Sequence, residues 1–295
     1  MSSVTLKQLR YFEAVYQFEH FGRAANACSI SQPALSMQIK ELEIAIGAVL
    51  IERTARQIRL TNFGEDFAKK AREILRSVDD LEDLARVRNS KFPAKLRIGI
   101  IPTIAPYLLP RFIEGLTKAA PEIDLRVRET QTKKLCQELE EGKLDAAILA
   151  LPVGETSLSE VALFEEEFVL VRPKKDAQNL VPDIGDLGAM KLLLLEEGHC
   201  FRDQALSFCN MDEAKLSGLL DGSSLSTLVQ MVGSGMGVTL IPQMAIDIET
   251  KSAEVSTARF TTSTPKRTIG MVWRNTNPMH DQLLLVSDIL GELAP

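Results

Sequence analysis

The fold of the N-terminal part of this chain is decided by one segment, Ser29-Ile30-Ser31-Gln32-Pro33-Ala34-Leu35-Ser36-Met37-Gln38-Ile39-Lys40-Glu41-Leu42. Ser31 suits a helix N-cap, and Pro33 is tolerated in the first turn that follows. Leu35, Ile39 and Leu42 recur at helical spacing, which predicts a helix with one buried face. The polar side chains that lie away from this face and can reach outward belong to Gln32, Ser36, Gln38 and Lys40.

Two further helices are predicted before this segment. The first has an apolar face made of Leu6, Leu9, Phe12, Val15 and Phe18. The second is a short helix of small residues, 23–28, joined to the next helix by a tight turn. Two short helices connected in this way form a helix-turn-helix, whose second helix enters the major groove of DNA. A three-helix packing motif with a polar outer face is the competing interpretation.

The stretch after these helices favours the DNA-binding interpretation. It carries an arginine at every third position between two β-prone pieces, which suits a β-wing lying along a DNA backbone. The prediction for residues 1–60 is therefore a winged helix-turn-helix. Glutamine can pair with adenine, and serine is less selective. The residues expected to contact DNA are Ser31, Gln32, Pro33, Ser36, Gln38, Lys40, Arg53, Arg56 and Arg59.

A longer helix is predicted to begin at Thr61 or Asn62. Its apolar residues step by three or four over about three heptads; they are Phe63, Phe67, Ala71, Ile74, Val78, Leu81 and Ala85. A helix lying on its own domain is the alternative, but a compact head has little surface to cover so long a stripe. We therefore expect residues 61–92 to be a linker and dimerisation helix that ends in a hinge.

Residues 93–295 show strands alternating with helices. The strands are expected at residues 95–101, 123–128, 144–149, 163–171, 192–195, 238–241 and 268–273. This alternation predicts parallel sheets with helices on both faces, in two lobes around a cleft. Lobe I comprises about 93–163 and 268–295, and lobe II about 164–267. Thr103 and Thr132 follow predicted strands and should face this cleft, although capping a helix is the commoner role of a threonine at such a place.

Composition separates the head from the remainder. Residues 1–60 carry seven Lys/Arg and five Asp/Glu, which gives +2, whereas the remaining 27 and 35 give −8. A weakly basic head can still bind phosphates if its arginines are clustered. The chain shows no secretory signal and no apolar run near the ~18 residues of a membrane span, so we expect a cytoplasmic protein without membrane contact. No Cys-x-x-Cys occurs, and we expect neither a metal nor a cofactor.

Two of the four cysteines share one segment, Glu196-Glu197-Gly198-His199-Cys200-Phe201-Arg202-Asp203-Gln204-Ala205-Leu206-Ser207-Phe208-Cys209. Cys200 is predicted to begin a helix, where the macrodipole favours a thiolate, and His199 and Arg202 could add positive charge. In a continuous helix the Cα atoms of Cys200 and Cys209 would lie on opposite faces about 13.5 Å apart. A disulfide needs roughly 4.4–6.8 Å, so bonding would require the helix to melt. Cys28 and Cys136 are expected to fill cores.

The chain resembles LysR-type transcriptional regulators. The matching pieces of the head are Leu9–Phe12, Ala24-Ala25, Ser31–Ser36, Ile39–Glu43, Leu50–Arg53 and Thr61–Gly64. Peroxide-sensing members of the family resemble it further at Ile101–Thr103, Pro106–Pro110, Gln131-Thr132, Gly198–Ala205, Phe208-Cys209 and Arg267–Gly270. The resemblance implies an α+β multidomain protein with a two-lobed effector domain of the periplasmic-binding-protein type.

The resemblance also implies roles for individual residues. Cys200 would be the peroxidatic thiol and Cys209 the resolving one. The residues that would place or activate peroxide are Thr103, Thr132 and His199, with Arg267 stabilising the charged sulfur region and Asp203 included in the site. Phe201 departs from the family pattern, which has a smaller aliphatic residue there, and we expect it to affect packing more than chemistry.

The implied function is an activator of oxidative-stress genes that senses hydrogen peroxide through a reversible Cys200–Cys209 disulfide. Its implied partners are promoter DNA, RNA polymerase, further copies of the chain in a homodimer or homotetramer, and a glutaredoxin or thioredoxin system as thiol reductant. One rival is a LysR-type regulator that senses a metabolite in the cleft, with both cysteines incidental. The other is a thiol peroxidase on the same fold, which leaves the DNA-binding head unexplained. We therefore do not expect an enzyme.

Overall fold

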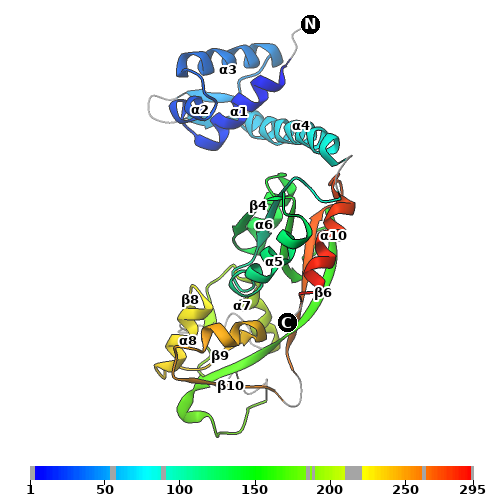
Figure 1. Ribbon diagram of the computed structural model, residues 1–295. Helices are drawn as coiled ribbons and strands as arrows, with labels where there is room; N and C mark the ends of the chain where they lie inside the picture. Colours follow the sequence, from blue (N-terminus) through cyan, green and yellow to red (C-terminus); the bar gives the residue numbers. More distant parts are fainter. Residues whose placement is uncertain are drawn as a thin grey trace. The chain divides into compact units, whose positions relative to one another are not determined.

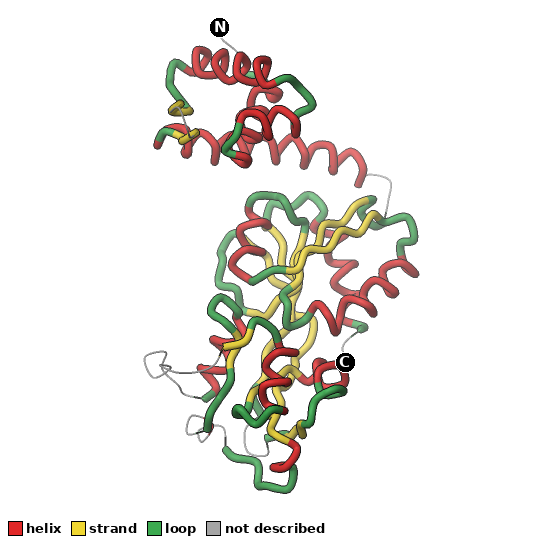
Figure 2. The backbone as a smooth tube through the Cα atoms, turned by 90° about the vertical axis from the view of Figure 1, so that its left-hand side faces the viewer, coloured by secondary structure: helices red, strands yellow, loops and turns green. Residues whose placement is uncertain are grey.

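The computed structural model describes residues 4–53, 58–87, 91–183, 187, 190–209, 221–260 and 264–293. The chain divides into two units, Met1–Ala85 and Arg86–Pro295. The first is mostly helical, whereas the second interleaves helices and strands (Figure 2). No helix in the described residues is long and apolar enough to cross a membrane.

Three helices form the head, as the sequence predicted: α1 (Leu6–Phe18), α2 (Phe21–Ala27) and α3 (Gln32–Ile46). Leu35, Ile39 and Leu42 of α3 are fully buried against the head core, which confirms the predicted apolar face. The hydroxyl of Ser31 accepts a hydrogen bond from the amide of Ala34, so Ser31 is the N-cap. α3 runs one turn beyond the predicted end, until Gly47 adopts a left-handed conformation.

The wing is a two-stranded antiparallel hairpin of β1 (Ile51–Arg53) and β2 (Ile58–Leu60). The carboxylate of Glu43, on α3, accepts hydrogen bonds from the amides of Leu50 and Ile51 and fixes the hairpin to that helix. Arg59 is exposed on β2. Arg56 and the side chain of Arg53 lie outside the part of the chain that the structure describes.

The long helix α4 spans Asn62–Val87. The hydroxyl of Thr61 accepts a hydrogen bond from the amide of Gly64 at 2.9 Å, so Thr61 and not Asn62 is the N-cap. Ala68 and Ala71 are buried. The apolar stripe continues past them onto the surface, where Phe63, Ile74 and Leu81 are 49%, 49% and 64% exposed. The side chain of Ala85 lies outside the description.

The second unit contains a seven-stranded sheet in the order β10-β6-β11-β5-β3-β4, with β9 beside β6, and the pair β7-β8. Its strands are β3 (Lys95–Ile100), β4 (Asp124–Glu129), β5 (Ala146–Leu151), β6 (Leu158–Pro173), β7 (Leu194–Leu195), β8 (Asp221–Gly222), β9 (Thr239–Pro242), β10 (Val255–Ala258) and β11 (Lys266–Arg274). Its helices are α5 (Ala105–Ala119), α6 (Thr132–Glu140), η1 (Lys174–Asp176), α7 (Cys200–Phe208), α8 (Leu225–Gly233), η4 (Gln243–Ala245), α9 (Ile246–Glu249) and α10 (His280–Gly291).

The expectation of purely parallel sheets was wrong. β3 runs parallel to β4 and β5, but β11, β9 and β10 all pair antiparallel with β6, and β11 pairs antiparallel with β5. The cause is β6, a 16-residue strand that runs the length of the unit (Figure 1). Its first half alternates between more and less exposed residues, and only residues 168–173 at its end are continuously buried. The sequence therefore indicated only the middle and end of the strand.

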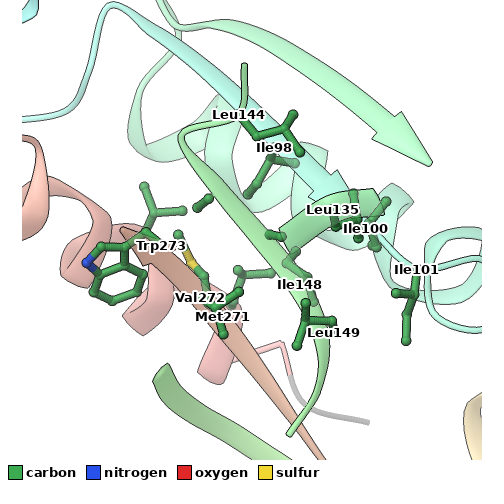
Figure 3. Packing of buried hydrophobic residues seen from close by; sticks show 14 of the residues in the cluster. Ile98, Ile100, Ile101, Leu135, Leu144, Ile148, Leu149, Met271, Val272 and Trp273 are labelled. Atoms are coloured by element: carbon green, nitrogen blue, oxygen red, sulfur yellow. The ribbon is translucent and has the colours of Figure 1, made fainter. Parts of the chain in front are cut away.

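Two hydrophobic cores lie along this strand. The lobe I core draws on residues 96–158 and 269–290, and Trp273, Ile148 and Ile100 belong to it (Figure 3). The lobe II core draws on residues 168–260. Cys136 packs in the lobe I core and Cys28 against the head core, as expected. Because β6 contributes residues to both cores, the two lobes are joined by one continuous strand.

We predict that a second copy of the chain covers the exposed apolar stripe of α4. Charged substitutions in that stripe should therefore weaken the dimer. The double substitution Ile74→Glu and Leu81→Glu would place two carboxylates in an apolar contact, raising the dimer dissociation constant at least about 100-fold. Light scattering after size exclusion measures the mass. Ser77→Glu, which adds charge at an exposed polar position of the same helix, is the control. An unchanged mass for the double variant would contradict the prediction.

Candidate functional site

The helix α7 presents the two cysteines of interest. Cys200 is its first residue and Cys209 is its C-cap, which confirms that residues 201–208 are helical while both thiols are free. Gly198 makes the turn into the helix with φ +93°. A Cβ atom there would lie 2.6 Å from Oε1 of Gln131, so glycine also permits a close approach of the two loops.

The two thiols lie in different surroundings. Cys200 is half-buried and packs against the lobe I core. Cys209 is 2% exposed and belongs to the lobe II core. The helix that was expected to hold the two cysteines apart is therefore present, and each sulfur packs among a different set of neighbours. A bond between them requires one thiol to leave its core.

Burial suppresses the reactivity of the other cysteines. It raises the pKa of Cys209 to about 11, and burial, with nearby carboxylates, raises the pKa of Cys136 to about 11. Burial also raises the pKa of Cys28. Because the thiolate is the nucleophile, these three thiols are poor nucleophiles at neutral pH.

Neither suggested source of positive charge is available beside Cys200. Burial lowers the pKa of His199, and the opposing effect of Glu196 is smaller, so the imidazole is neutral at pH 7. A neutral ring can accept a proton. Arg202 is turned away, donating 2.7 Å and 2.8 Å hydrogen bonds to the carbonyl of Leu195 and the carboxylate of Asp221.

A buried ion pair lies behind the cysteine helix. The side chains of Arg267, from β11, and Glu166, from β6, are both 0% exposed, with Nη2 and Oε2 separated by 2.7 Å. The same guanidinium donates to the hydroxyl of Thr103 at 2.8 Å and to its carbonyl oxygen at 3.0 Å. A buried charge requires an ion-pair partner and hydrogen bonds of this kind. Glu166 was missed, since the run Glu165-Glu166-Glu167 does not indicate which carboxylate turns inward.

Thr103 and Thr132 are not the helix caps that their positions suggested. The N-cap of α5 is Ile104, and that of α6 is Gln131. The hydroxyl of Thr132 is buried without a hydrogen-bond partner among the described residues, as is Oε1 of Gln204. Unsatisfied buried polar atoms are rare, and each calls for an explanation such as a bound water, an ion or a catalytic role. Gln204 was also missed, although its spacing of four from Cys200 places both on one helix face.

A cavity of about 420 Å³ lies between the lobes. Thr103 and His199 line it together with the loops that follow β3 and β4, where the sequence predicted a cleft. The hydroxyl of Tyr107, from lobe I, donates to the buried carboxylate of Glu249, from lobe II, at 2.6 Å across this cavity. Cys200, Thr132 and Arg267 do not line it.

The remaining predicted site residues lie at two places. Asp203 is exposed in the first turn of α7. At the start of α3, Ser31, Gln32 and Pro33 are exposed, as is Lys40 further along the helix. Ser36 and Gln38 are half-buried, and Gln38 donates to Glu41 at 2.7 Å. In the described residues there is no group of three or more histidine, cysteine or acidic side chains that could hold a metal.

Comparisons with known proteins cover both units. Residues 6–65 match the model "Bacterial regulatory helix-turn-helix protein, lysR family", and residues 91–295 match "LysR substrate binding domain". The chain is 37% identical, over 98% of its length and 95% of the relative, to a hydrogen peroxide-inducible genes activator of Dickeya chrysanthemi. It is 37% identical to the regulator EstR of Acinetobacter baylyi, over 98% and 97%. A full-length OxyR variant from Pseudomonas aeruginosa superposes with a TM-score of 0.78 at 35% identity, over 98% and 95%.

The pKa directions predict a strong selectivity in alkylation. At pH 7 iodoacetamide should modify Cys200 before Cys136 and Cys209, because Cys200 is half-buried at a helix start whereas those two thiols are buried and have a raised pKa. Labelling of Cys209 should accelerate by up to about tenfold per pH unit below its pKa, as its thiolate fraction rises. Peptide mass spectrometry of the native protein at pH 7 and pH 9 measures both. Equal labelling rates for Cys200 and Cys209 at pH 7 would contradict the assignment, and Cys200→Ser is the control.

Proposed function

Because the chain belongs to the LysR family of bacterial regulatory helix-turn-helix proteins, we propose that it is a transcription regulator that senses hydrogen peroxide through Cys200 and Cys209. The single observation that carries this proposal is α7, which has a half-buried thiol at its start and a buried thiol at its end, packed against separate cores. That arrangement couples oxidation to refolding. The peroxide-inducible activators and OxyR among its relatives support the same assignment.

In the first step the Cys200 thiolate attacks one oxygen of peroxide and the O–O bond breaks. The sulfur becomes a sulfenic acid, and the departing hydroxide takes a proton to form water. Thr103 already accepts a hydrogen bond from Arg267 at 2.8 Å, so its own hydroxyl proton is free for another acceptor. Thr132 has an unused buried hydroxyl, and neutral His199 can exchange the proton. We assign these three residues to positioning peroxide, with Arg267 holding Thr103.

In the second step the Cys209 sulfur attacks the sulfenic sulfur of Cys200. The S–O bond breaks, the S–S bond forms, and a second water leaves. Cys209 must first leave the lobe II core, which means that α7 unfolds at least in part. Two thiols of a glutaredoxin or thioredoxin system would return the two electrons and regenerate the helix.

The output is a change in DNA binding. We assign residues 1–60 to DNA binding, residues 61–92 to the linker and dimerisation helix, and residues 93–295 to sensing in two lobes. The exposed start of α3 would meet base edges, and the wing arginines would meet phosphates. Refolding of α7 would alter how the sensing domains of a tetramer pair, and thereby the spacing of the heads and their contact with RNA polymerase. Because promoter DNA and thiol reductants are found in the bacterial cytoplasm, we propose that the protein acts there.

Metabolite sensing is the second candidate function, and two observations favour it. The cavity between the lobes is large enough for a small molecule. Identity to EstR equals identity to the peroxide-inducible activator, so overall similarity does not separate the two functions. The geometry of α7 favours peroxide sensing, because a metabolite sensor would not need a thiol at each end of this helix. In the proposed cycle the output of the oxidised thiols is a change in DNA binding through the helix-turn-helix head, so we propose a regulator and not an enzyme.

The proposed function predicts that one equivalent of peroxide per chain produces a Cys200–Cys209 disulfide and changes the DNA footprint. Cys200→Ser should abolish both effects, because it removes the reacting sulfur. Cys209→Ser should stop at the sulfenic acid, which dimedone traps. Mass spectrometry and footprinting on the same sample measure the outcome. A footprint that still responds to peroxide in Cys200→Ser would sink the proposal, and Cys136→Ser, whose thiol packs in the lobe I core, is the matched control.

A further inference from the structure

Two phenylalanines of α7 lie beside its cysteines. Phe201 follows Cys200 directly, and Phe208 precedes Cys209 directly. Both rings pack on Phe168 of β6, with ring centroids 4.8 Å and 5.3 Å away and the rings inclined at 60° and 65°. Inclined aromatic pairs at such distances attract one another beyond their burial. Each end of α7 is therefore held through the neighbour of a reacting cysteine.

The ring of Phe168 is a fixed point. It is fully buried in the lobe II core. Its backbone pairs with Pro242 of β9 in the sheet, and its amide donates to the carbonyl oxygen of Pro265 at 2.9 Å. Movement between helix and sheet must therefore come from α7.

The buried guanidinium of Arg267 adds a third contact. Its central carbon lies 5.5 Å from the ring centroid of Phe201 and 5.7 Å from that of Phe168. A desolvated cation over aromatic faces is attracted more strongly than an exposed one. Because Arg267 also holds Thr103, the folded helix is connected to the peroxide-positioning residues by direct contacts. We name Phe168, Phe201, Phe208 and Arg267 the aromatic anchor.

We propose that the aromatic anchor sets the oxidation threshold of the switch, by holding α7 in its reduced, helical form until Cys200 has been oxidised. Neither cysteine can travel toward the other without drawing its neighbouring phenylalanine off Phe168. Loss of these contacts is thus part of every route from sulfenic acid to disulfide. Phe201 and Phe208 are positioning residues, acting on the second step and leaving the chemistry of peroxide attack to others. The inference rests on the proposed function, but its first test does not require that function to be correct.

That first test needs no peroxide. In the reduced full-length protein, the labelling rate of Cys209 by iodoacetamide reports how often α7 opens. Phe201→Leu and Phe208→Leu keep the sites apolar while removing the ring contacts, and each should raise that rate about tenfold. Phe112→Leu is the matched control, because Phe112 is fully buried in the lobe I core and should leave Cys209 labelling near the wild-type rate.

The second test measures the switch. Both anchor variants should convert sulfenic acid to disulfide about tenfold faster and lower the disulfide reduction potential by about 30 mV, the equivalent of tenfold for two electrons. Phe208 has no contact with Arg267 among those described, so Phe208→Leu should leave dimedone trapping in a Cys209→Ser background unchanged. A general destabilisation would instead alter Phe112→Leu equally.

The outcomes are separable. If the wild-type chain forms no Cys200–Cys209 disulfide with peroxide, the proposed function fails, whereas the labelling experiment still decides whether the anchor holds α7. If both anchor variants label Cys209 at the wild-type rate, or if Phe112→Leu accelerates it as much as they do, the anchor is overturned. Circular dichroism of each variant verifies that the chain is folded before its labelling rate or its disulfide formation is measured.

Discussion

A helix cannot bring its own two ends together, and this constraint governs the sensing unit. Cys200 and Cys209 bracket α7, so the hydrogen-bonded helix itself keeps their sulfurs apart. The two cysteines of the reduced protein therefore cannot form a disulfide while α7 remains folded. In the proposed switch, oxidation is followed by local unfolding, so that a chemical event at one sulfur atom becomes a change in backbone structure. The rest of the unit can be understood as support for this arrangement.

The support comes from two cores and one buried ion pair. The lobe I core receives Cys200, whereas the lobe II core holds Cys209 and raises its pKa to about 11. The Arg267–Glu166 pair joins β11 to β6, the strand that contributes to both cores. A buried pair of this kind adds little net stability. Its value here is positional, since it fixes Thr103 on one side and meets Phe201 on the other.

Much of this could be predicted from the sequence, because it depends on local rules. Helix periodicity located α1, α3 and α4, and the Ser31 cap was visible in the residues themselves. The geometry of a helix was enough to separate Cys200 from Cys209. The resemblance directed attention to Thr103, Thr132 and Arg267, and in the structure Arg267 contacts Phe201 of the cysteine helix and holds Thr103.

What could not be predicted depends on contacts between distant segments. The half-exposed beginning of β6 resembles a loop in the sequence, so the antiparallel centre of the sheet was missed. The choice of Glu166 among three adjacent glutamates follows from the strand register across β11. Burial lowers the pKa of His199 and so removes the positive charge expected there, and hydrogen bonds turn Arg202 toward Asp221. The same kind of contact, between β6 and α7, created the aromatic anchor.

Hydrogen exchange of the backbone amides in residues 201–208 tests the central claim most directly. The account predicts that these amides are protected in the reduced protein and lose that protection once the Cys200–Cys209 disulfide has formed, while the amides of β5 in the lobe I core stay protected throughout. Retention of full protection across residues 201–208 in protein shown by mass spectrometry to carry the disulfide would contradict it.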